Sequence, residues 1–372
     1  MGSAWMSDHD EPTSEVLELH SAPAIFRRLS TGVVGQEVGK RDLATLLAMH
    51  VQWFLNGKSD PAHTAPNALI IGPTGVGKTH AIRTAADALQ IPLAIADATR
   101  LLSTGIGEES LDTVLVELLR ASRRLIGSRA GDREFDEPPE LEELALASKG
   151  IVFLDEFDKL ASHGNSQEDR AELVQRRLLQ FIDGARITLP PSRHVGEEEM
   201  VFNTAGLLFV VAGAFTDLLA RTGDRPHKVM RGLARHNHVI PQDVERYGFM
   251  KELVARIPVI IEFSALSEED LVGILRTKQV DPSQFYVEYL ASLGTTLKIT
   301  DDARRWIAAN AAKLEAGARG LHQVLFPILS LLSQDVENSR KSPDSIVLDE
   351  ILVRKLARRV EERRDVRAAN SP

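Results

Sequence analysis

The chain has no cysteine, no apolar segment of membrane-spanning length and no secretion signal in its sequence. Without cysteine, neither a structural disulfide nor a thiolate metal site can form. No apolar run approaches the ~20 residues that a transmembrane helix needs, and the acidic beginning of the chain lacks the apolar core of a signal peptide. We therefore expect a cytoplasmic protein with no membrane association.

The rest of the composition is typical of a globular protein. The chain has 372 residues, of which 43% are hydrophobic and 26% charged, and this length favours a large core divided between two domains. The formal net charge of −9 argues weakly against a nucleic-acid-binding surface, although a local basic patch could lie within it. Residues 1–24 begin as a polar, acidic and aperiodic stretch, which predicts a disordered N-terminal segment.

A glycine-rich loop near residue 75 carries the strongest functional signal. An apolar run over 68–71 predicts a buried strand, and an alanine-rich helix follows to residue 89. The glycines lack a Cβ, so the loop backbone can direct several N–H groups toward a triphosphate. The positive end of the helix dipole favours the same ligand. The pattern GxxxxGK(S/T) is filled by Gly72, Pro73, Thr74, Gly75, Val76, Gly77, Lys78 and Thr79.

Two residues of this pattern have direct roles in the predicted site. Lys78 would reach the β- and γ-phosphates, and the Thr79 hydroxyl would ligate Mg²⁺. A glycine-rich turn with a solvated lysine is the alternative interpretation of the bare motif. The strand before the motif and the helix after it favour a nucleoside triphosphate site.

A pair of acids supplies the second half of the predicted site. The apolar run over 150–154 predicts a strand that ends in Asp155 and Glu156. Mg²⁺ keeps much of its hydration shell in proteins, so we expect Asp155 to hold the metal, mostly through water. We expect Glu156 to polarise the water that attacks the γ-phosphate. The alternative is two acids that merely end a strand, which their position downstream of the phosphate loop disfavours.

Apolar strands and amphipathic helices alternate through the first two thirds of the chain. This order is typical of an α/β domain with a parallel sheet flanked by helices. Residues 129–143 are rich in charge and proline without a period, which predicts a surface insertion. Strands are expected at 68–71, 92–95, 150–154, 205–214 and 258–263, with helices at 111–125, 166–182 and 242–256.

The pattern changes near Ser264. A capping box between Ser267 and Asp270 begins a mostly helical region. We therefore predict a large α/β domain over 25–263 and a small α-rich lid domain over 264–372. Helices of the lid are expected at 271–276, 284–293, 300–314 and 320–338, before a short strand at 345–348 and a charged helix to about residue 364.

Several of these segments resemble a known family. GPTGVGKT and IVFLDEFDKL resemble the two nucleotide motifs of AAA+ ATPases, and PLAIADAT is similar to a segment of the ClpX-type protein unfoldases within that family. The resemblance runs from about Val33 to Leu356. It implies an AAA+ P-loop core with a small helical lid, ATP and Mg²⁺ as cofactors, and ATP hydrolysis as the activity.

The same resemblance implies further site residues. GFMKELVARIPV resembles the segment of the arginine finger, which would be Arg256, and GARGL resembles the sensor-2 motif, which would make Arg319 the sensor. Val33 and Val34 lie where the family contacts adenine. A finger from a neighbouring subunit neutralises charge that develops on the γ-phosphate, so the resemblance implies a homo-hexameric ring with nucleotide at its interfaces. For an isolated arginine, a surface salt bridge is the alternative, which the flanking motifs disfavour.

The chain departs from the family pattern in the pore loops. The first pore loop of the family presents the aromatic residue of a GYVG motif, whereas Gly105, Ile106 and Gly107 offer only an aliphatic side chain. Isoleucine can still wedge against an extended polypeptide, with less area and no stacking. LPPSRH resembles part of the second pore loop, so Arg193 and His194 would face the channel. An exposed loop is the alternative for these two residues.

Three further family features have no counterpart in the sequence. The zinc-binding N-terminal domain of the family is built on cysteines, and this chain has none. No sensor-1 polar residue is evident in LLFVVAGAF, so none is assigned. No IGF-type tripeptide occurs between Phe215 and Pro241, which argues against coupling to a ClpP-like peptidase.

The sequence leaves three functions to compare. The first is a ring-forming, ATP-dependent unfoldase or remodelling chaperone that acts on a protein substrate in its central pore. The second is a nucleotide-dependent switch or scaffold for one dedicated partner, without processive unfolding. ATP-dependent loss of fluorescence from a tagged folded protein separates these two. The third is a nucleic-acid motor, which the acidic charge disfavours and which predicts stimulation of hydrolysis by DNA or RNA.

Overall fold

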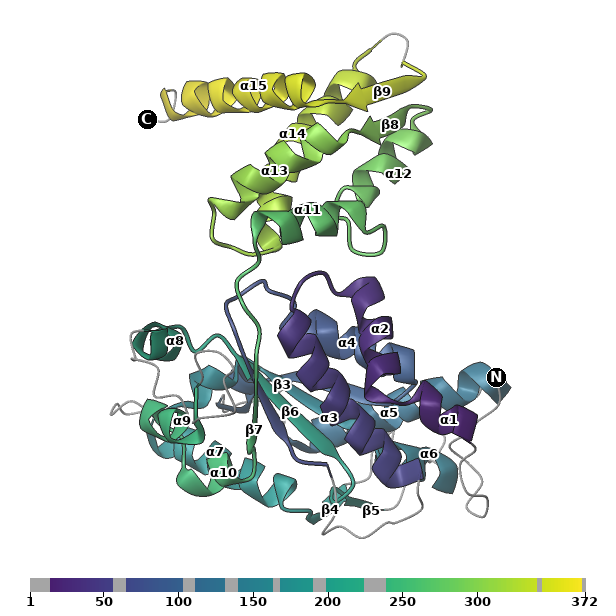
Figure 1. Cartoon of the computed structure of the whole chain (residues 1–372), viewed down its shortest axis with the longest axis vertical. Helices are drawn as coiled ribbons and strands as arrows, with labels where there is room; N and C mark the ends of the chain where they lie inside the picture. The colour runs from purple at the N-terminus through teal and green to yellow at the C-terminus, as the bar shows by residue number, and fades with distance from the viewer. Residues whose placement is uncertain are drawn as a thin grey trace. The chain divides into compact units, whose positions relative to one another are not determined.

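The structure is a computed structural model that describes residues 14–55, 65–102, 111–130, 140–162, 168–189, 199–223, 239–339 and 343–369. The chain divides into two compact units (Figure 1). Unit 1 comprises Met1–Val33, Glu37–Pro73 and Lys78–Phe263, and unit 2 comprises Val34–Gln36, Thr74–Gly77 and Ser264–Pro372. Unit 2 therefore includes four residues of the phosphate loop.

The elements alternate in unit 1 and become mostly helical in unit 2. The helices of unit 1 are α1 (Ser14–Leu19), α2 (Ala22–Gly32), α3 (Glu37–Leu55), α4 (Lys78–Leu89), α5 (Leu111–Ala130), α6 (Leu141–Ala147), α7 (Glu168–Ile182), α8 (Thr216–Gly223), α9 (Pro241–Tyr247) and α10 (Lys251–Ala255), with the 3₁₀ helices η2 (Ala98–Leu102) and η3 (Phe157–Leu160). Its strands are β1 (Ala68–Ile71), β2 (Leu93–Asp97), β3 (Ile151–Asp155), β4 (Arg186–Leu189), β5 (Met200–Asn203), β6 (Leu208–Gly213) and β7 (Val259–Glu262). Unit 2 contains α11 (Glu268–Arg276), α12 (Gln284–Ser292), β8 (Thr296–Ile299), α13 (Asp301–Ala312), α14 (Arg319–Glu337), β9 (Ser345–Leu348) and α15 (Glu350–Ala369).

A five-stranded parallel sheet forms the centre of unit 1. Its strand order is β2-β3-β6-β1-β7, so β1 lies between β6 and β7. Ala68 of β1 is aligned with Val210 on one side and with Val259 on the other. Every residue of β1 and β6 is buried, which is typical of parallel strands covered on both faces. The predicted α/β fold with a parallel sheet is confirmed.

Helices cover this sheet (Figure 1). α3 contacts β7, α4 contacts β3, and α5 contacts β2 and β3. In α4 the buried residues Ala81, Ile82, Ala85 and Leu89 recur at helical spacing and so lie on one side of the helix. Because all five strands run in the same direction, their carboxyl ends meet at one edge of the sheet. The phosphate loop begins at that edge.

Two segments that the sequence predicts to be irregular, 1–24 and 129–143, are partly helical. α1 and the start of α2 fall within the segment expected to be disordered. Ala24, Ile25 and Leu29 bury an apolar face of α2. Residues 1–13 lie outside the described residues. The insertion predicted at 129–143 overlaps the end of α5 and the beginning of α6, and 131–139 lie outside the described residues.

Two other parts of unit 1 differ from the sequence predictions. The strands β4 and β5, which pair in antiparallel fashion, have no counterpart among the predicted strands. The single helix predicted at 242–256 is divided into α9 and α10. The break falls at Gly248, which has a φ of 121° and whose Cβ, if present, would lie 2.4 Å from the carbonyl oxygen of Ser162. A helix cannot continue through that conformation.

Unit 2 packs its helices around a core rich in leucine. The predicted capping box begins α11: Asp270 N donates to Ser267 Oγ at 3.1 Å, and Ser267 N donates to Asp270 Oδ2 at 2.8 Å. The predicted strand at 345–348 is β9, and it pairs in parallel with β8. β8 is absent from the predictions because its four residues alternate too briefly to give a strand signal.

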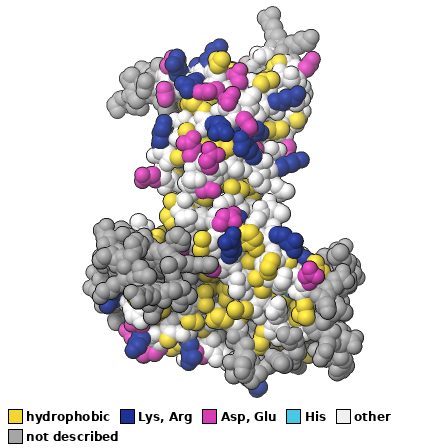
Figure 2. All heavy atoms as spheres, in the orientation of Figure 1, with side chains coloured by type: hydrophobic (Ala, Val, Ile, Leu, Met, Phe, Trp, Pro, Cys, Tyr) yellow, Lys and Arg dark blue, Asp and Glu magenta, His cyan; other side chains and the backbone are white. Residues whose placement is uncertain are grey.

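The surface of unit 2 carries charges of both signs. Figure 2 shows Lys and Arg side chains interspersed with Asp and Glu over the face in view. Several of these charges pair, among them Arg276 with Asp301 at 3.0 Å and Arg304 with Asp301 at 3.3 Å. In the part of the chain that the structure describes, no helix is long and apolar enough to span a membrane.

Candidate functional site

The phosphate loop leaves the carboxyl end of β1 and leads into α4. Gly72 donates its N–H to the Gly213 carbonyl at 3.3 Å, and a Cβ on Gly72 would lie 2.2 Å from the carbonyl oxygen of Phe263. Gly75 and Gly77 have φ values of +78° and +96°, a region that other residues enter only with strain. These three glycines are therefore needed for the path of the loop.

Lys78 is folded back onto the beginning of the loop. Its ammonium donates to the carbonyl oxygens of Gly72, at 2.6 Å, and Pro73, at 3.0 Å, and the residue is only 8% exposed. Carbonyl oxygens satisfy the buried charge in this arrangement. Lys78 therefore already lies at the loop that a phosphate would occupy. A triphosphate is a stronger acceptor than a carbonyl, so it can replace these carbonyl oxygens as the partner of the ammonium.

The structure brings together Thr79 and Asp155, which are 76 residues apart in the sequence. The Thr79 hydroxyl donates to Asp155 Oδ2 at 2.5 Å, and the N–H of Glu156 donates to Asp155 Oδ1 at 2.9 Å. Both oxygens of the Asp155 carboxylate are therefore held in place. Thr79 and Asp155 meet because β3 ends and α4 begins at the same edge of the sheet.

Glu156 has an unusual backbone conformation for its residue type. Its φ of 54° and ψ of 32° lie in the left-handed region, which costs a residue other than glycine roughly 1–3 kcal/mol. The left-handed step ends β3 and starts η3 directly after the carboxylate of Asp155. The Glu156 side chain is exposed and so is accessible to water beside that carboxylate.

The donor set at this edge fits a magnesium ion that a nucleotide shares. Among the described residues, no group of three or more His, Asp or Glu side chains could hold a metal ion by itself. Mg²⁺ in nucleotide enzymes is typically bound by one or two protein oxygens together with phosphate oxygens and water. The Thr79 hydroxyl and the Asp155 carboxylate supply such a pair.

The beginning of α14 contacts the phosphate loop within unit 2. Ala318 N donates to the Gly75 carbonyl at 2.9 Å, and a Cβ on Gly317 would lie 2.5 Å from the same Gly75 oxygen. Arg319, the predicted sensor, is the next residue along the chain and the first residue of α14. The Arg319 side chain is exposed. It therefore starts next to the phosphate loop and is not packed in the core of unit 2.

Arg256 lies near the opposite edge of the sheet from the phosphate loop of its own chain. Its carbonyl accepts a hydrogen bond from Asn67 Nδ2 at 3.0 Å, and Asn67 directly precedes β1, whereas the loop follows that strand. Four strand residues span about 13 Å. The Arg256 side chain is 57% exposed and pairs with Asp183 at 2.6 Å. A surface pair of this kind contributes about 0–1 kcal/mol, so it can be exchanged for a stronger partner.

Two buried residues lie between α2 and α3. Val33 is buried at the end of α2. Gln36 is buried as well, and its side-chain amide donates to Ser264 O at 2.7 Å and to Val76 O at 3.5 Å, while its carbonyl accepts from Ser264 N at 2.9 Å. Sequence reasoning missed Gln36 because its partners are far away along the chain. Its φ of +59° gives no sequence signal either.

The predicted pore-loop residues lie outside the described residues. This holds for Gly105, Ile106 and Gly107 of the first loop and for Arg193 and His194 of the second.

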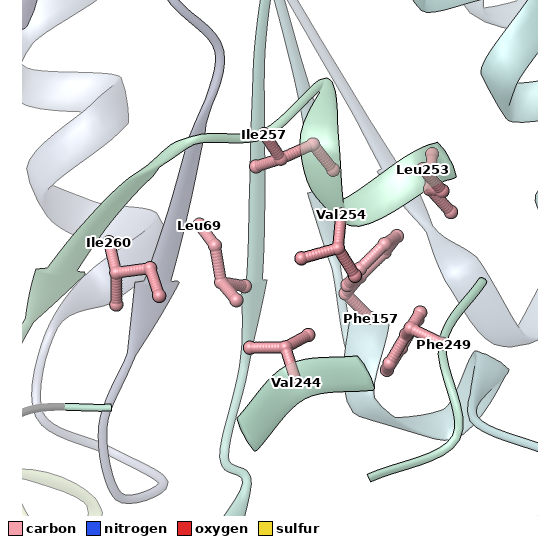
Figure 3. A pocket seen from close by; sticks show the side chains of 8 residues that line it. All are labelled: Leu69, Phe157, Val244, Phe249, Leu253, Val254, Ile257 and Ile260. Carbon is pink, nitrogen blue, oxygen red and sulfur yellow. The ribbon is translucent and has the colours of Figure 1, made fainter. Parts of the chain in front are cut away.

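A small cavity in unit 1 can be excluded as the ligand site. Figure 3 shows eight apolar side chains around it, from the sheet, from η3 and from the region of α9 and α10. Its volume is about 10 Å³, roughly the minimum for one water molecule, and it offers no polar partner. It is a packing gap beneath α10.

A phosphate loop after a central strand, with an acidic pair at the end of another strand of the same parallel sheet, defines a P-loop nucleotide hydrolase. Residues 63–260 match the family model described as the AAA domain (Cdc48 subfamily), and residues 266–334 match that of the C-terminal, D2-small domain, of ClpB protein. The chain is also 31% identical over 332 residues to the ATP-dependent Clp protease ATP-binding subunit ClpX 2 of Wolinella succinogenes. That alignment covers 85% of this chain and 78% of that protein.

The chain therefore belongs to the AAA+ ATPases and is of the ClpX-like type. It binds nucleotide and hydrolyses ATP, and at the level of the family it is an ATP-dependent chaperone. The resemblance predicted from the two nucleotide motifs is thereby confirmed.

Proposed function

We propose that this chain is a ring-forming, ATP-driven protein remodeller that hydrolyses ATP with Mg²⁺ at the interfaces of a homo-hexamer. Unit 1 is the ATPase domain and the part of unit 2 from Ser264 onward is the lid domain. Each cycle of hydrolysis moves the pore loops against a bound polypeptide substrate. The observation that carries the proposal is the position of Arg256, exposed and remote from the phosphate loop of its own chain.

The chemical roles follow from the contacts at the edge of the sheet. Lys78 binds the β- and γ-phosphates, Thr79 and Asp155 hold Mg²⁺, and Glu156 polarises the attacking water. The backbone of Gly72, Pro73, Thr74, Gly75, Val76 and Gly77 surrounds the phosphates. Arg319 at the start of α14 contributes positive charge from the same chain, and Arg256 of an adjacent subunit completes the site.

A guanidinium from another subunit explains why Arg256 is exposed. Delivered in trans, such an arginine increases the rate of phosphoryl transfer by roughly 10³–10⁵-fold. The pair with Asp183 holds the side chain at the surface until a neighbour offers a phosphate, which binds arginine more strongly. Arg256→Ala should therefore retain ATP binding and lose turnover by about 10³-fold or more.

Mixing two inactive variants tests this arrangement. Lys78→Ala lacks the phosphate contact but keeps its finger, whereas Arg256→Ala keeps the phosphate contact and lacks the finger. In randomly mixed rings, about one interface in four combines an intact Lys78 with an intact Arg256. We expect about a quarter of wild-type ATP turnover from an equal mixture, and almost none from either variant alone.

The controls separate ring formation from catalysis. Differently tagged subunits and native mass spectrometry report whether the two variants share rings, and an equal mixture of wild type with Lys78→Ala gives the expected upper limit. Shared rings without any recovered turnover would refute a finger in trans. Glu156→Gln should bind ATP without hydrolysing it. Continued hydrolysis by this variant would show that Glu156 does not polarise the attacking water.

The second candidate is a nucleotide-dependent switch for one dedicated partner. Ile106 favours it, because the aliphatic side chain replaces the aromatic residue that grips a polypeptide in this family. Unfolding of a tagged fluorescent protein in the presence of ATP decides between the two. Loss of fluorescence with wild type but not with Glu156→Gln supports the remodeller, and ATP turnover without loss supports the switch.

A further inference from the structure

The peptide group at the end of β6, between Gly213 and Ala214, is hydrogen-bonded on both sides. The carbonyl of a trans peptide points away from its N–H, and β6 lies between β1 and β3 in the sheet. On the side of β1, the Gly213 carbonyl accepts from the N–H of Gly72 at 3.3 Å. On the side of β3, the Ala214 N–H donates to Asp158 Oδ1 at 3.3 Å. One peptide group therefore connects the beginning of the phosphate loop with η3.

The Asp158 carboxylate takes the place of a strand backbone in this contact. β3 ends at Asp155, and the left-handed Glu156 turns the chain out of the sheet into η3. A side chain of η3 thus accepts the hydrogen bond that a continuing strand would accept with its backbone. The Asp158 side chain is 6% exposed, and its second oxygen lies 3.6 Å from the Lys159 ammonium. A buried carboxylate is costly unless it is bound by such partners, so the side chain is held toward β6.

The conformation of Glu156 depends on how η3 is held. Its φ of 54° and ψ of 32° are strained for a residue other than glycine, and such strain persists only where the surrounding structure maintains it. Two contacts of η3 maintain it from within unit 1. The ring of Phe157 stacks on that of Phe249 with their centroids 4.6 Å apart (Figure 3). The carboxylate of Asp158 binds the Ala214 N–H, which is the contact that leads on to the phosphate loop.

We propose that Asp158 is a positioning residue for ATP hydrolysis, which keeps Glu156 in its left-handed conformation by binding the peptide group at the end of β6. This inference rests on the role proposed for Glu156 in polarising the attacking water. Without the Asp158 carboxylate, the Ala214 N–H loses its acceptor. An extended Glu156 relieves the backbone strain and returns a backbone carbonyl to the side of β6. The Glu156 carboxylate then leaves its position beside Asp155.

Asp158→Ala should separate ATP binding from turnover. The variant keeps Lys78 and the phosphate loop, so its affinity for ATP should be little changed. Its kcat should fall by roughly 10- to 100-fold, because a misplacement of about 1 Å in a catalytic group costs about 10²-fold in rate. Asp158→Asn keeps an oxygen that can accept from Ala214 and should recover most of the turnover. A crystal structure of Asp158→Ala should show a negative φ at Glu156.

Asp281→Ala is the matched control for a loss of stability. Asp281 and Asp158 are each 7% exposed, and the Asp281 carboxylate also accepts from a backbone N–H, that of Ser283 at 2.8 Å. Asp281 belongs to unit 2 and has no part in the proposed nucleotide site. Thermal unfolding should show a loss of stability in both variants. Phosphate release should show a loss of kcat only in Asp158→Ala.

Gly213→Ala disturbs the same contact should Asp158→Ala fold poorly. A Cβ on Gly213 would lie 2.7 Å from Asp158 Oδ1 and 2.9 Å from Asp158 N, so η3 must move away from β6 although the carboxylate is present. Gly206→Ala is its control, because a Cβ there would lie 2.6 Å from the Ser148 carbonyl oxygen, just before the other end of β6. Neither glycine has a positive φ. Only Gly213→Ala should lose turnover, and combining it with Asp158→Ala should cost no more than the more impaired single variant.

The outcomes distinguish this inference from the proposed function. Wild-type kcat in Asp158→Ala, or equal losses of kcat in Asp158→Ala and Asp158→Asn, would overturn the inference alone. So would a left-handed Glu156 in the structure of Asp158→Ala, or losses that multiply in the double variant. Hydrolysis by Glu156→Gln at the rate of wild type would overturn the role of Glu156, and this inference with it.

Discussion

Replacing Gly317 by alanine should separate the geometry of the phosphate loop from general stability. Gly317 has a φ of +58°, and its Cβ would lie 2.5 Å from the carbonyl oxygen of Gly75. Cβ atoms essentially never approach a heavy atom within 3.0 Å, so the loop and the start of α14 must move apart by at least about 0.5 Å. The colliding atom belongs to the backbone and cannot turn aside as the end of a side chain can.

Such a shift is large enough to affect catalysis. A misplacement of about 1 Å in groups that position a substrate costs about 10²-fold in rate. We therefore expect Gly317→Ala to lower kcat/KM for ATP by roughly 10- to 100-fold. The left-handed backbone adds about 1 kcal/mol of destabilisation for alanine, which corresponds to a decrease in Tm of about 2–4 °C.

Gly294→Ala is the matched control for this experiment. Gly294 has a φ of +81°, and a Cβ there would meet no heavy atom of the described residues within 4 Å. It therefore has a similar backbone strain without the collision. Thermal unfolding should show a loss of stability in both variants, which is larger in Gly317→Ala because of the collision. Phosphate release should show a loss of turnover only in Gly317→Ala. Equal turnover in the two variants would refute the idea that this contact positions the loop.

Three further predictions follow from individual contacts. Thr79→Val removes the hydroxyl bound to Asp155 and should lower Mg²⁺-dependent turnover by about 10²-fold, whereas Thr79→Ser should keep activity. Nucleotide affinity measured in EDTA should not change in Thr79→Val. A loss of that affinity would contradict the role of Thr79 in binding the metal. Burial lowers the pKa of His50 from 6.5 to about 4. Between pH 4 and pH 6.5 the unfolded chain therefore binds more protons than the folded chain. The free energy of unfolding should fall by about 3 kcal/mol as the pH decreases from 6.5 to 4. His50→Gln, which can still donate to Lys149 O, should flatten that dependence in urea titrations, and an unchanged slope would exclude His50 as its origin. Glu143→Gln removes the charge of a buried carboxylate that binds Arg123 and should cost roughly 3 kcal/mol. Glu172→Gln, at an exposed pair with Arg176, should cost less than about 1 kcal/mol, and similar costs for the two variants would contradict the importance of burial.

The parts of the site that could be predicted are those with a local cause. A loop around a triphosphate needs glycine, lysine and a hydroxyl at fixed spacing, and the buried strands before Gly72 and Asp155 are continuous apolar runs. The sheet could be predicted for the same reason. The hairpin β4–β5 and strand β8 could not, because four alternating residues carry too little signal without their partner strands.

At Lys40, the spacing of the neighbouring apolar residues carries more information about burial than the residue type does. A lysine in a helix is normally interpreted as exposed. Lys40, however, continues the spacing of Leu43, Leu47 and Val51 on the buried face of α3, and this periodicity could have identified it as a buried cation in need of a partner. The partner itself, the Val33 carbonyl, could not have been found, because it depends on the turn between α2 and α3.

The backbone of the phosphate loop is held from two sides within unit 2, and this has a thermodynamic consequence for the proposed function. The Gly75 carbonyl accepts from Ala318, and the Val76 carbonyl lies 3.5 Å from the amide of Gln36, which also holds both backbone groups of Ser264. A loop that rearranges around a triphosphate must change these bonds. Coupling free energies are reciprocal, so a ligand whose binding changes these bonds alters ATP affinity by the same factor by which ATP alters the affinity for that ligand. The same bonds that shape the loop are therefore the ones through which a change in unit 2 would regulate nucleotide binding.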